Sequence, residues 1–381
     1  MADNMFFSRD TKVYIAYLNA SGAEVSSAVW EIPVLDGFSF SQATNTSEVT
    51  LNEMSAGSNV SRRGRKLFTD SYAPAEWSFS TYARPFATTG AGAGQADDTS
   101  GRQHCVEEPL WAMMATNATY TAPVDGASEA AWSAGITTDA TDMDITFAGS
   151  NLTELAKANI YFAVGKTGES QIVYKLSDCC VNEAGIDFDI DGITTINWSG
   201  MGTMISEVST HPAATRYEGT GVTATSNFIR NRLTELSAVS TLPANVTYGL
   251  TLTGGSITIS NNMTFLTPET IGVINQPLGA VTGTRSVGGS FTCYMNNASN
   301  SSMDLFENII EATGTVTNTF ALGFKIGGAA GLPRLELNAG ACHLEVPTHS
   351  IDDVISLEVN FHALGTDIDS TDELTVLYKG Q

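Results

Sequence analysis

The sequence predicts a mainly β (α+β) protein built from two tandem β-sandwich or barrel-like domains, each with one packed helix. Only 15% of the 381 residues are charged, and Thr, Ser, Asn, Gly and Ala fill most polar positions. Exposed helices normally carry Glu, Lys and Arg, so this composition favours strands and turns. Several short segments alternate apolar and polar residues with the period of a half-buried strand. These segments recur in the same order in both halves of the chain, which predicts a duplication.

The internal repeat is clearest in one long stretch without gaps. Residues 172–203 align there with residues 335–366, and Asn197 falls on Asn360. Shorter matches precede it in the same order: 38–41 with 257–260, 78–82 with 290–294, and 110–111 with 305–306. Each match is weak alone, but their shared order is hard to obtain by chance, so the order supports the duplication.

Each repeat is predicted to contain one helix between its strands. In the first repeat Pro109 marks the start of the helix, because proline is favoured in the first helical turn. In the second, Ser301 and Asp304 have the spacing of a capping box. The residues expected to form the buried stripes are Leu110, Trp111, Met113 and Met114, then Leu305, Phe306, Ile309 and Ile310. Their spacing is helical, and we interpret them as core residues.

The repeats divide the chain into four parts. A stretch rich in Thr, Gly, Ala and Ser without periodicity separates the repeats and is interpreted as a linker or surface crossover. Two polar segments of the first repeat are expected to be long loops. The expected bounds are an N-terminal arm 1–10, domain one 11–205 with loops 45–75 and 87–104, a linker 206–227, and domain two 228–381.

The charge is strongly acidic, with 41 Asp and Glu against 18 Lys and Arg, a formal net charge of −23. A nucleic-acid binder needs a positive surface that displaces counterions from phosphate, so a DNA-binding site is not expected. Two interpretations remain. The acidic surface repels DNA, or the acidity keeps an abundant protein soluble.

The first twelve residues have neither the basic nor the apolar region of a secretory signal. No apolar run reaches the ~20 residues that a membrane helix needs. The five cysteines lack metal-site spacing, so we expect synthesis in a cytosol with free thiols. A disulfide between subunits is left open.

The strand-and-turn pattern of the second half, with a looser counterpart in residues 11–203, resembles that of two-domain phage tail tube proteins. The segments that carry the resemblance are 254–262, 265–269, 283–285, 289–292, 343–355 and 360–364. Single-domain members of that family form hexameric rings that stack into a tube. The resemblance implies that a fused pair of domains reaches the same pseudo-sixfold ring as a homotrimer.

The resemblance therefore implies a structural subunit of a phage tail tube, located in the virion tail and assembled in the host cytoplasm. An acidic lumen would conduct the genome during ejection, with DNA only as transient cargo. The other implied partners are tip or baseplate, terminator and tape-measure proteins, with a sheath as an open question. Another virion β-module, such as a head-decoration or receptor-binding protein, is the alternative. No enzyme activity, cofactor, metal or membrane contact is expected.

A basic cluster in the first long loop has three interpretations. Arg62, Arg63, Arg65 and Lys66 lie within a few residues of one another. In the family a long loop between early strands contacts the adjacent ring, so we prefer an inter-ring contact with acidic residues. A solvated loop is the second interpretation. Direct DNA binding is the third, and it is disfavoured because no aromatic residues surround the cluster for base stacking.

Catalytic and metal motifs are incomplete in this sequence. Gly165, Lys166 and Thr167 resemble the end of a phosphate-binding loop, but Ile160 stands where the first glycine is required. Residues 187–192 resemble the opening of a calcium loop, yet Trp198 occupies the twelfth position and the segment alternates as a strand does. We interpret Asp367, Asp369, Asp372 and Glu373 as a solvated acidic turn. A hydrolase would need a convergent cluster that these residues do not supply.

Overall fold

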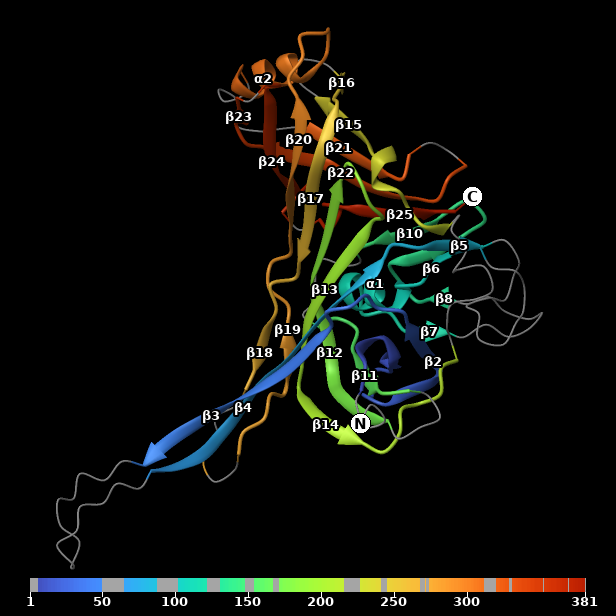
Figure 1. Cartoon of the computed structure of the whole chain (residues 1–381), viewed down its shortest axis with the longest axis vertical. Helices are drawn as coiled ribbons and strands as arrows, with labels where there is room; N and C mark the ends of the chain where they lie inside the picture. The colour runs from blue at the N-terminus through green and yellow to red at the C-terminus, as the bar shows by residue number, and fades with distance from the viewer. Residues whose placement is uncertain are drawn as a thin grey trace, which may run out of the picture.

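A computed structural model describes residues 6–49, 65–87, 102–121, 131–147, 154–166, 171–215, 227–240, 245–267, 271, 274–311, 320–328, 331–351, 353–368 and 370–380. Within these ranges the protein is mainly β, as expected, with two α-helices packed among the strands (Figure 1). Most of the second expected loop, residues 88–101, and much of the expected linker, residues 216–226, lie outside the described residues.

The first half of the chain contributes eight main strands, each antiparallel to its neighbours. In order of pairing they run β2–β1–β11–β12–β13–β4–β3, and β14 pairs with the N-terminal half of β12. β1 and β11 are apolar almost throughout and buried, whereas β13 alternates buried and more exposed residues. Their bounds are β1 Lys12–Leu18, β2 Glu24–Ile32, β3 Ser39–Val49, β4 Lys66–Tyr82, β11 Ala158–Val164, β12 Ile172–Asp189, β13 Thr195–Gly202 and β14 Met204–Val208.

The second half of the chain pairs its strands in the same succession. The order is β16–β15–β21–β22–β24–β20–β17, and β25 pairs with the N-terminal half of β22. Strand for strand, each step corresponds to one in the first half. The bounds are β15 Glu235–Ser240, β16 Val246–Gly249, β17 Leu252–Ser260, β20 Ser286–Tyr294, β21 Phe320–Ile326, β22 Arg334–Leu344, β24 Ser356–Leu364 and β25 Thr375–Lys379.

Short elements complete the described chain. In the first half they are β5 Pro85–Ala87, β6 Gln103–Cys105, α1 Glu108–Ala115, β7 Tyr120–Thr121, β8 Ala131–Trp132, β9 Ile136–Thr138 and β10 Met143–Thr146. In the second they are β18 Thr264–Leu266, β19 Gly279–Val281, α2 Ser302–Glu311 and β23 Thr348–Ser350. Two 3₁₀ turns lie at Ser8–Asp10 and Asn231–Leu233.

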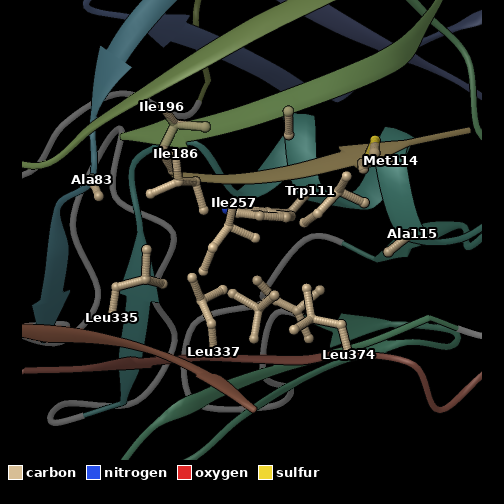
Figure 2. Close-up of a cluster of buried hydrophobic side chains, with 14 of the residues drawn as sticks. Ala83, Trp111, Met114, Ala115, Ile186, Ile196, Ile257, Leu335, Leu337 and Leu374 are labelled. Atoms are coloured by element: carbon tan, nitrogen blue, oxygen red, sulfur yellow. The ribbon is translucent and has the colours of Figure 1, made fainter. Parts of the chain in front are cut away.

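Two strand pairings join the halves into one body. β12 pairs with β17 over residues 183–189 and 254–260, and β10 pairs with β25. One hydrophobic cluster therefore continues across the expected linker, and Figure 2 shows Trp111 and Met114 of α1 gathered with Ile257 and Leu337 from the second half. Within the described residues the buried core is continuous from one half to the other.

Helix α1 is buried along its whole length, including the stripe predicted for it. Pro109 lies in its first turn as expected. The indole Nε1 of Trp111 donates to the hydroxyl of Tyr378 on β25 (2.8 Å), and that hydroxyl donates to Glu107 Oε1 (2.5 Å). Because a buried polar group without a partner is costly, this chain of bonds is what allows an indole, a phenol and a carboxyl to share the core.

The buried stripe predicted for helix α2 is only partly confirmed. Leu305 and Ile309 are buried, but Ile310 is 43% exposed, so the predicted stripe was one residue too wide. The predicted capping box is not formed. Asp304 accepts the N–H of Asn300 (2.6 Å), whereas the hydroxyl of Ser301 donates to a backbone carbonyl instead of capping the helix.

The expected loop 45–75 is in its described part a two-stranded arm. β3 and β4 pair in register out to Val49 and Lys66, with irregularities near Thr44 and Thr46, and Figure 1 shows the hairpin extending away from the body. Neither side of its outer part is buried, so the residues there show no apolar alternation. That absence is why the sequence indicated a loop. β14 likewise continues three residues into the expected linker.

Glu107 should make the stability of the chain pH-dependent. Burial raises the pKa of its carboxyl from 4.5 to about 7, although Tyr378 and Arg84 act in the opposite direction. The protonated form is thus favoured in the folded state, so this group's stabilisation is full below pH 4.5 and is lost as the pH rises through 7. We expect Glu107→Gln, which keeps the acceptor for Tyr378, to stabilise the unassembled chain at pH 8.5 by about 1–3 kcal/mol.

The measurement is urea unfolding of the unassembled chain at pH 5, 7 and 8.5. The exposed Glu235→Gln is the control, and it should leave the pH profile as in the unmodified protein. An unchanged pH profile in Glu107→Gln would contradict the prediction.

Candidate assembly surfaces

The central strands share one polar face, on the side opposite the core. Along β24 every second residue is buried and the residues between them are exposed. The registers place the outward residues of six strands in cross-strand rows, since successive side chains of a strand point to opposite sides of the sheet. One row runs His362, Gly288, Thr258, Gly185, Asn197 and Ser80.

We call this surface the polar sheet face, defined as the outward residues of 76–80, 183–189, 195–199, 254–260, 286–292 and 356–362. Its residues are mostly Gly, Ser, Thr and Asn, and none of these segments contains Lys or Arg. Its carboxylates are Glu76, Glu183, Asp187, Asp189 and Glu358, all exposed. The face therefore concentrates negative charge on a wall of small side chains.

Hydrogen bonds between strands hold the side chains of this face in place. Asn197 accepts from Ser80 Oγ (2.6 Å) and donates to Asp187 Oδ2 (3.1 Å). At the edge of the sheet the hydroxyls of Ser39 and Ser78 lie 2.8 Å apart. Composition alone did not separate these acidic residues from the others. The signal that could have done so was the alternation of small polar with large apolar residues.

The first arm, residues 44–49 and 65–72, carries two members of the predicted basic cluster, Arg65 and Lys66. Arg65 forms an ion pair with Glu48 of the same hairpin (2.5 Å), and Lys66 lies 5.5 Å from the centre of the Phe68 ring. The bond from Arg65 lowers the pKa of Glu48. Arg62 and Arg63 lie outside the described residues. The positive charge of Arg65 is thus already paired within its own hairpin.

A second arm, the described residues of 264–281 with β18 and β19, lies beside the first (Figure 1). The N–H of Tyr72 donates to the carbonyl of Asn275 (3.0 Å), and the N–H of Asn275 donates to the carbonyl of Asp70 (3.3 Å). Exposed apolar side chains cluster on the two arms: Leu67, Phe68, Leu266, Ile271, Ile274 and Leu278. Such a cluster marks an interaction surface, and sequence analysis missed it because it singled out only the charges.

At its β3 end the central sheet has an open strand edge. Among the described strands β3 pairs with β4 alone, although its counterpart β17 lies between β20 and β12. An open edge presents unpaired N–H and C=O groups and invites another strand. The body therefore offers three surfaces for assembly: the polar sheet face, the arms and this edge.

Several titratable groups of the described residues are buried in the core. His104 Nδ1 lies 2.8 Å from Glu108 Oε2, and Trp132 Nε1 donates to the other oxygen of that carboxyl (2.5 Å). All five cysteines are buried and unpaired, and burial raises the pKa of Cys105 and Cys179 well above its ordinary value. In the described part of the chain no three His, Cys, Asp or Glu residues are placed to hold a metal, and no described helix is long and apolar enough to cross a membrane.

The two acidic segments singled out in the sequence, residues 187–192 and 367–373, have different outcomes in the structure. Residues 187–189 continue β12, with Phe188 buried between exposed Asp187 and Asp189, as the alternation indicated. In the expected acidic turn, Asp372 accepts bonds from the N–H and hydroxyl of Thr366, and Asp369 lies outside the described residues. Glu373 corrects the interpretation, because it is largely buried and forms an ion pair with Arg285.

Comparisons with known proteins identify the family of this chain. A family model described as phage tail tube protein matches residues 34–363. The chain is 30% identical over 371 residues to tail tube protein pb6 of Escherichia phage T5, a match that covers 96% of this chain and 74% of that protein. The family model and the relative each match most of this chain. The chain therefore belongs to the phage tail tube protein family, whose place is the tail of the virion.

Proposed function

We propose that three copies of this chain form a pseudo-hexameric ring and that the rings stack into the tail tube. The observation that supports the proposal is the series of strand pairings that occurs once in each half of the chain. Each half then acts as one tube domain, residues 11–205 and 228–381, with arm 1–10 and linker 206–227. The pairing of β12 with β17 supplies the junction between adjacent domains within one chain.

Closure of the ring follows from that junction. A head-to-tail contact closes when its rotation divides a full turn. Three chains contain three internal junctions, and three similar junctions between chains would complete six. The open edge of β3 becomes harmless once a neighbour pairs with it.

The polar sheet face is proposed to line the lumen. Its five carboxylates repeat in every copy, and it offers no Lys or Arg to a passing phosphate. Like charges repel, and counterion release, which drives proteins onto DNA, gains nothing at an acidic wall. DNA is then transient cargo that slides past the wall without binding.

The arms are proposed to contact the adjacent ring. They extend away from the body, and they carry both exposed apolar residues and part of the basic cluster (Figure 1). Arg62, Arg63, Arg65 and Lys66 would face acidic residues of the neighbouring ring, while the apolar side chains would be buried there. The ends of the tube would meet tip or baseplate, terminator and tape-measure proteins. No step in this role requires catalysis.

Symmetry is the direct test. We expect purified chain, imaged by cryo-electron microscopy, to form hollow tubes whose rings contain three copies, each spanning two of six similar sectors. Isolated particles would instead favour a decoration or receptor-binding protein, and rings of six whole chains would contradict the two-domain arrangement.

Reversing charge on the lumen wall should slow the genome. Asp187→Lys with Asp189→Lys adds cations where the face has none, so phosphates gain binding sites and release counterions. We expect DNA ejection from phage carrying this pair to slow on the order of tenfold at low salt and to recover at high salt. Triggered ejection followed by a DNA-binding dye measures it.

Glu307→Lys with Glu235→Lys makes the same change of charge on exposed residues off the polar sheet face. This control should eject at the normal rate. Equal slowing of DNA ejection in both variants would contradict a specific role for charge on the polar sheet face.

Reversing the basic cluster should weaken stacking. Arg62, Arg63, Arg65 and Lys66 are changed together to Glu, which removes attraction to acidic residues of the next ring and adds repulsion. Surface pairs contribute about 0.2–1 kcal/mol each, so we expect the critical concentration for polymerisation to rise on the order of tenfold at low salt and less at high salt. Light scattering gives this concentration. Arg232→Glu, an exposed cation outside the arms, is the control, and unchanged polymerisation of the quadruple variant at both salts would refute the contact.

A further inference from the structure

The junction between β12 and β17 provides a template for the contact between two chains. β3 is the counterpart of β17, and β22 with β23 is the counterpart of β12, as the two matching series of pairings indicate. Within the chain, β12 of the first half pairs with β17 of the second half. The reverse combination, β23 with β3, is left for a second copy.

The registers fix which residues correspond. The alignment of 78–82 with 290–294 equates Ser78 with Ser290, whose partners are Ser39 on β3 and Ser256 on β17. Ser39 is therefore the counterpart of Ser256. This assignment lies two residues from the sequence alignment, and a shift of two keeps every side chain on its own face.

The long alignment, combined with other strand pairings, independently gives the same register. The long alignment equates Asp187 with Ser350. Asp187 lies opposite Thr195, which lies opposite Tyr82, and Ser350 lies opposite Ser356, which lies opposite Tyr294. The end points Tyr82 and Tyr294 are the pair that the shorter alignment had already equated. Two separately aligned segments thus agree through the strands between them.

We propose that β3 of one copy pairs antiparallel with β23 of the next copy. The template pairs Gly185 with Thr258 and Asp187 with Ser256. Carried to the interface, Ser41 lies opposite Thr348, Phe40 opposite His349, and Ser39 opposite Ser350. This assignment rests on the proposed ring and names the strands that close it. Pro347, which has no amide N–H to donate, limits the pairing on the N-terminal side of β23.

Side-chain sizes are complementary at the next position. In the template the ring of Phe188, 2% exposed, fills the space where a Cβ on Gly255 would stand, 2.7 Å from that ring. At the interface the counterpart of Phe188 is Ile351 and the counterpart of Gly255 is Phe38. The larger side chain therefore lies on the β3 side of the interface, and the smaller one lies on the β23 side. Ile351 is 79% exposed in the single chain. Pairing would bury it as Phe188 is buried.

The polar side of the interface is equally compatible. Ser39, Ser41 and Thr348 are exposed and uncharged, so the strands can meet without repulsion. Their alternate positions place them on the polar sheet face, which then continues from one copy to the next. The edge of β3 would no longer be open, since its N–H and C=O groups would pair.

Disulfide trapping tests the register. The double variant Ser41→Cys, Thr348→Cys is assembled, mildly oxidised and denatured without reductant. Opposed residues of antiparallel strands have Cα atoms about 4.5–5.5 Å apart, within reach of a disulfide. We expect covalent trimers. The control Ser39→Cys, Thr348→Cys shifts one partner by two residues, ~7 Å along the strand, beyond the reach of a disulfide, and should stay monomeric, as should the unmodified chain with its buried thiols.

A second variant covers the case in which the cysteine pair fails to assemble. Ile351→Asp places a charge in the proposed apolar contact, and it should abolish rings while leaving the thermal unfolding of the unassembled chain almost unchanged. Ile368→Asp, at another exposed isoleucine, should assemble normally.

The outcomes separate this inference from the ring itself. Threefold rings with no cross-link in the matched pair, cross-linking in the shifted pair, or normal assembly of Ile351→Asp would each overturn the β3–β23 register while the proposed function stands. Failure of the unmodified chain to form rings or tubes would overturn the proposed function.

Discussion

The whole arrangement depends on the backbone pairing of β12. This strand of 18 residues pairs with β11 and β14 along its first half and with β13 and β17 along its second. A register shift between Val181 and Glu183 accompanies the change of partners, in keeping with the tendency of bulges to bend and twist a strand. The same strand thereby builds the sheet of the first half and fastens the second half to it. Without this double pairing the polar sheet face would not run unbroken from the first half to the second.

The sequence predicted best where burial imposes a period. Trp111 and Met114 lie in the core as expected, and residues 187–189 alternate between exposed and buried as their sequence indicated. The outer arm was missed because Thr, Ser and Asn on a hairpin exposed on both sides carry no period. Ile310 was misplaced because helical spacing marks a stripe but not its width. The positions of Arg285 and Glu373 depend on contacts between distant segments, which no local pattern contains.

The two-residue shift between sequence and register has a physical reason. Sequence matching placed Trp198 on Phe361, since both are aromatic, whereas the pairings place Val359 where Trp198 lies. Both alignments keep large apolar residues toward the core, because a shift of two returns each side chain to the same face. Composition on each face is thus well specified by sequence, but the register is specified only by the ladder of hydrogen bonds.

The alternation of buried and exposed residues lets the same strands form both the core and the polar sheet face. Residues such as Phe291 and Val359 pack the core from one side, and Ser290 and Glu358 cover the other. Because neighbouring residues point in opposite directions, the chemistry of the proposed lumen wall can vary without altering the packing that holds the sheet together. A wall without cations requires only that polar positions avoid Lys and Arg. The stability of the sheet is carried by the apolar positions, so an acidic wall and a rigid sheet do not compete for the same residues.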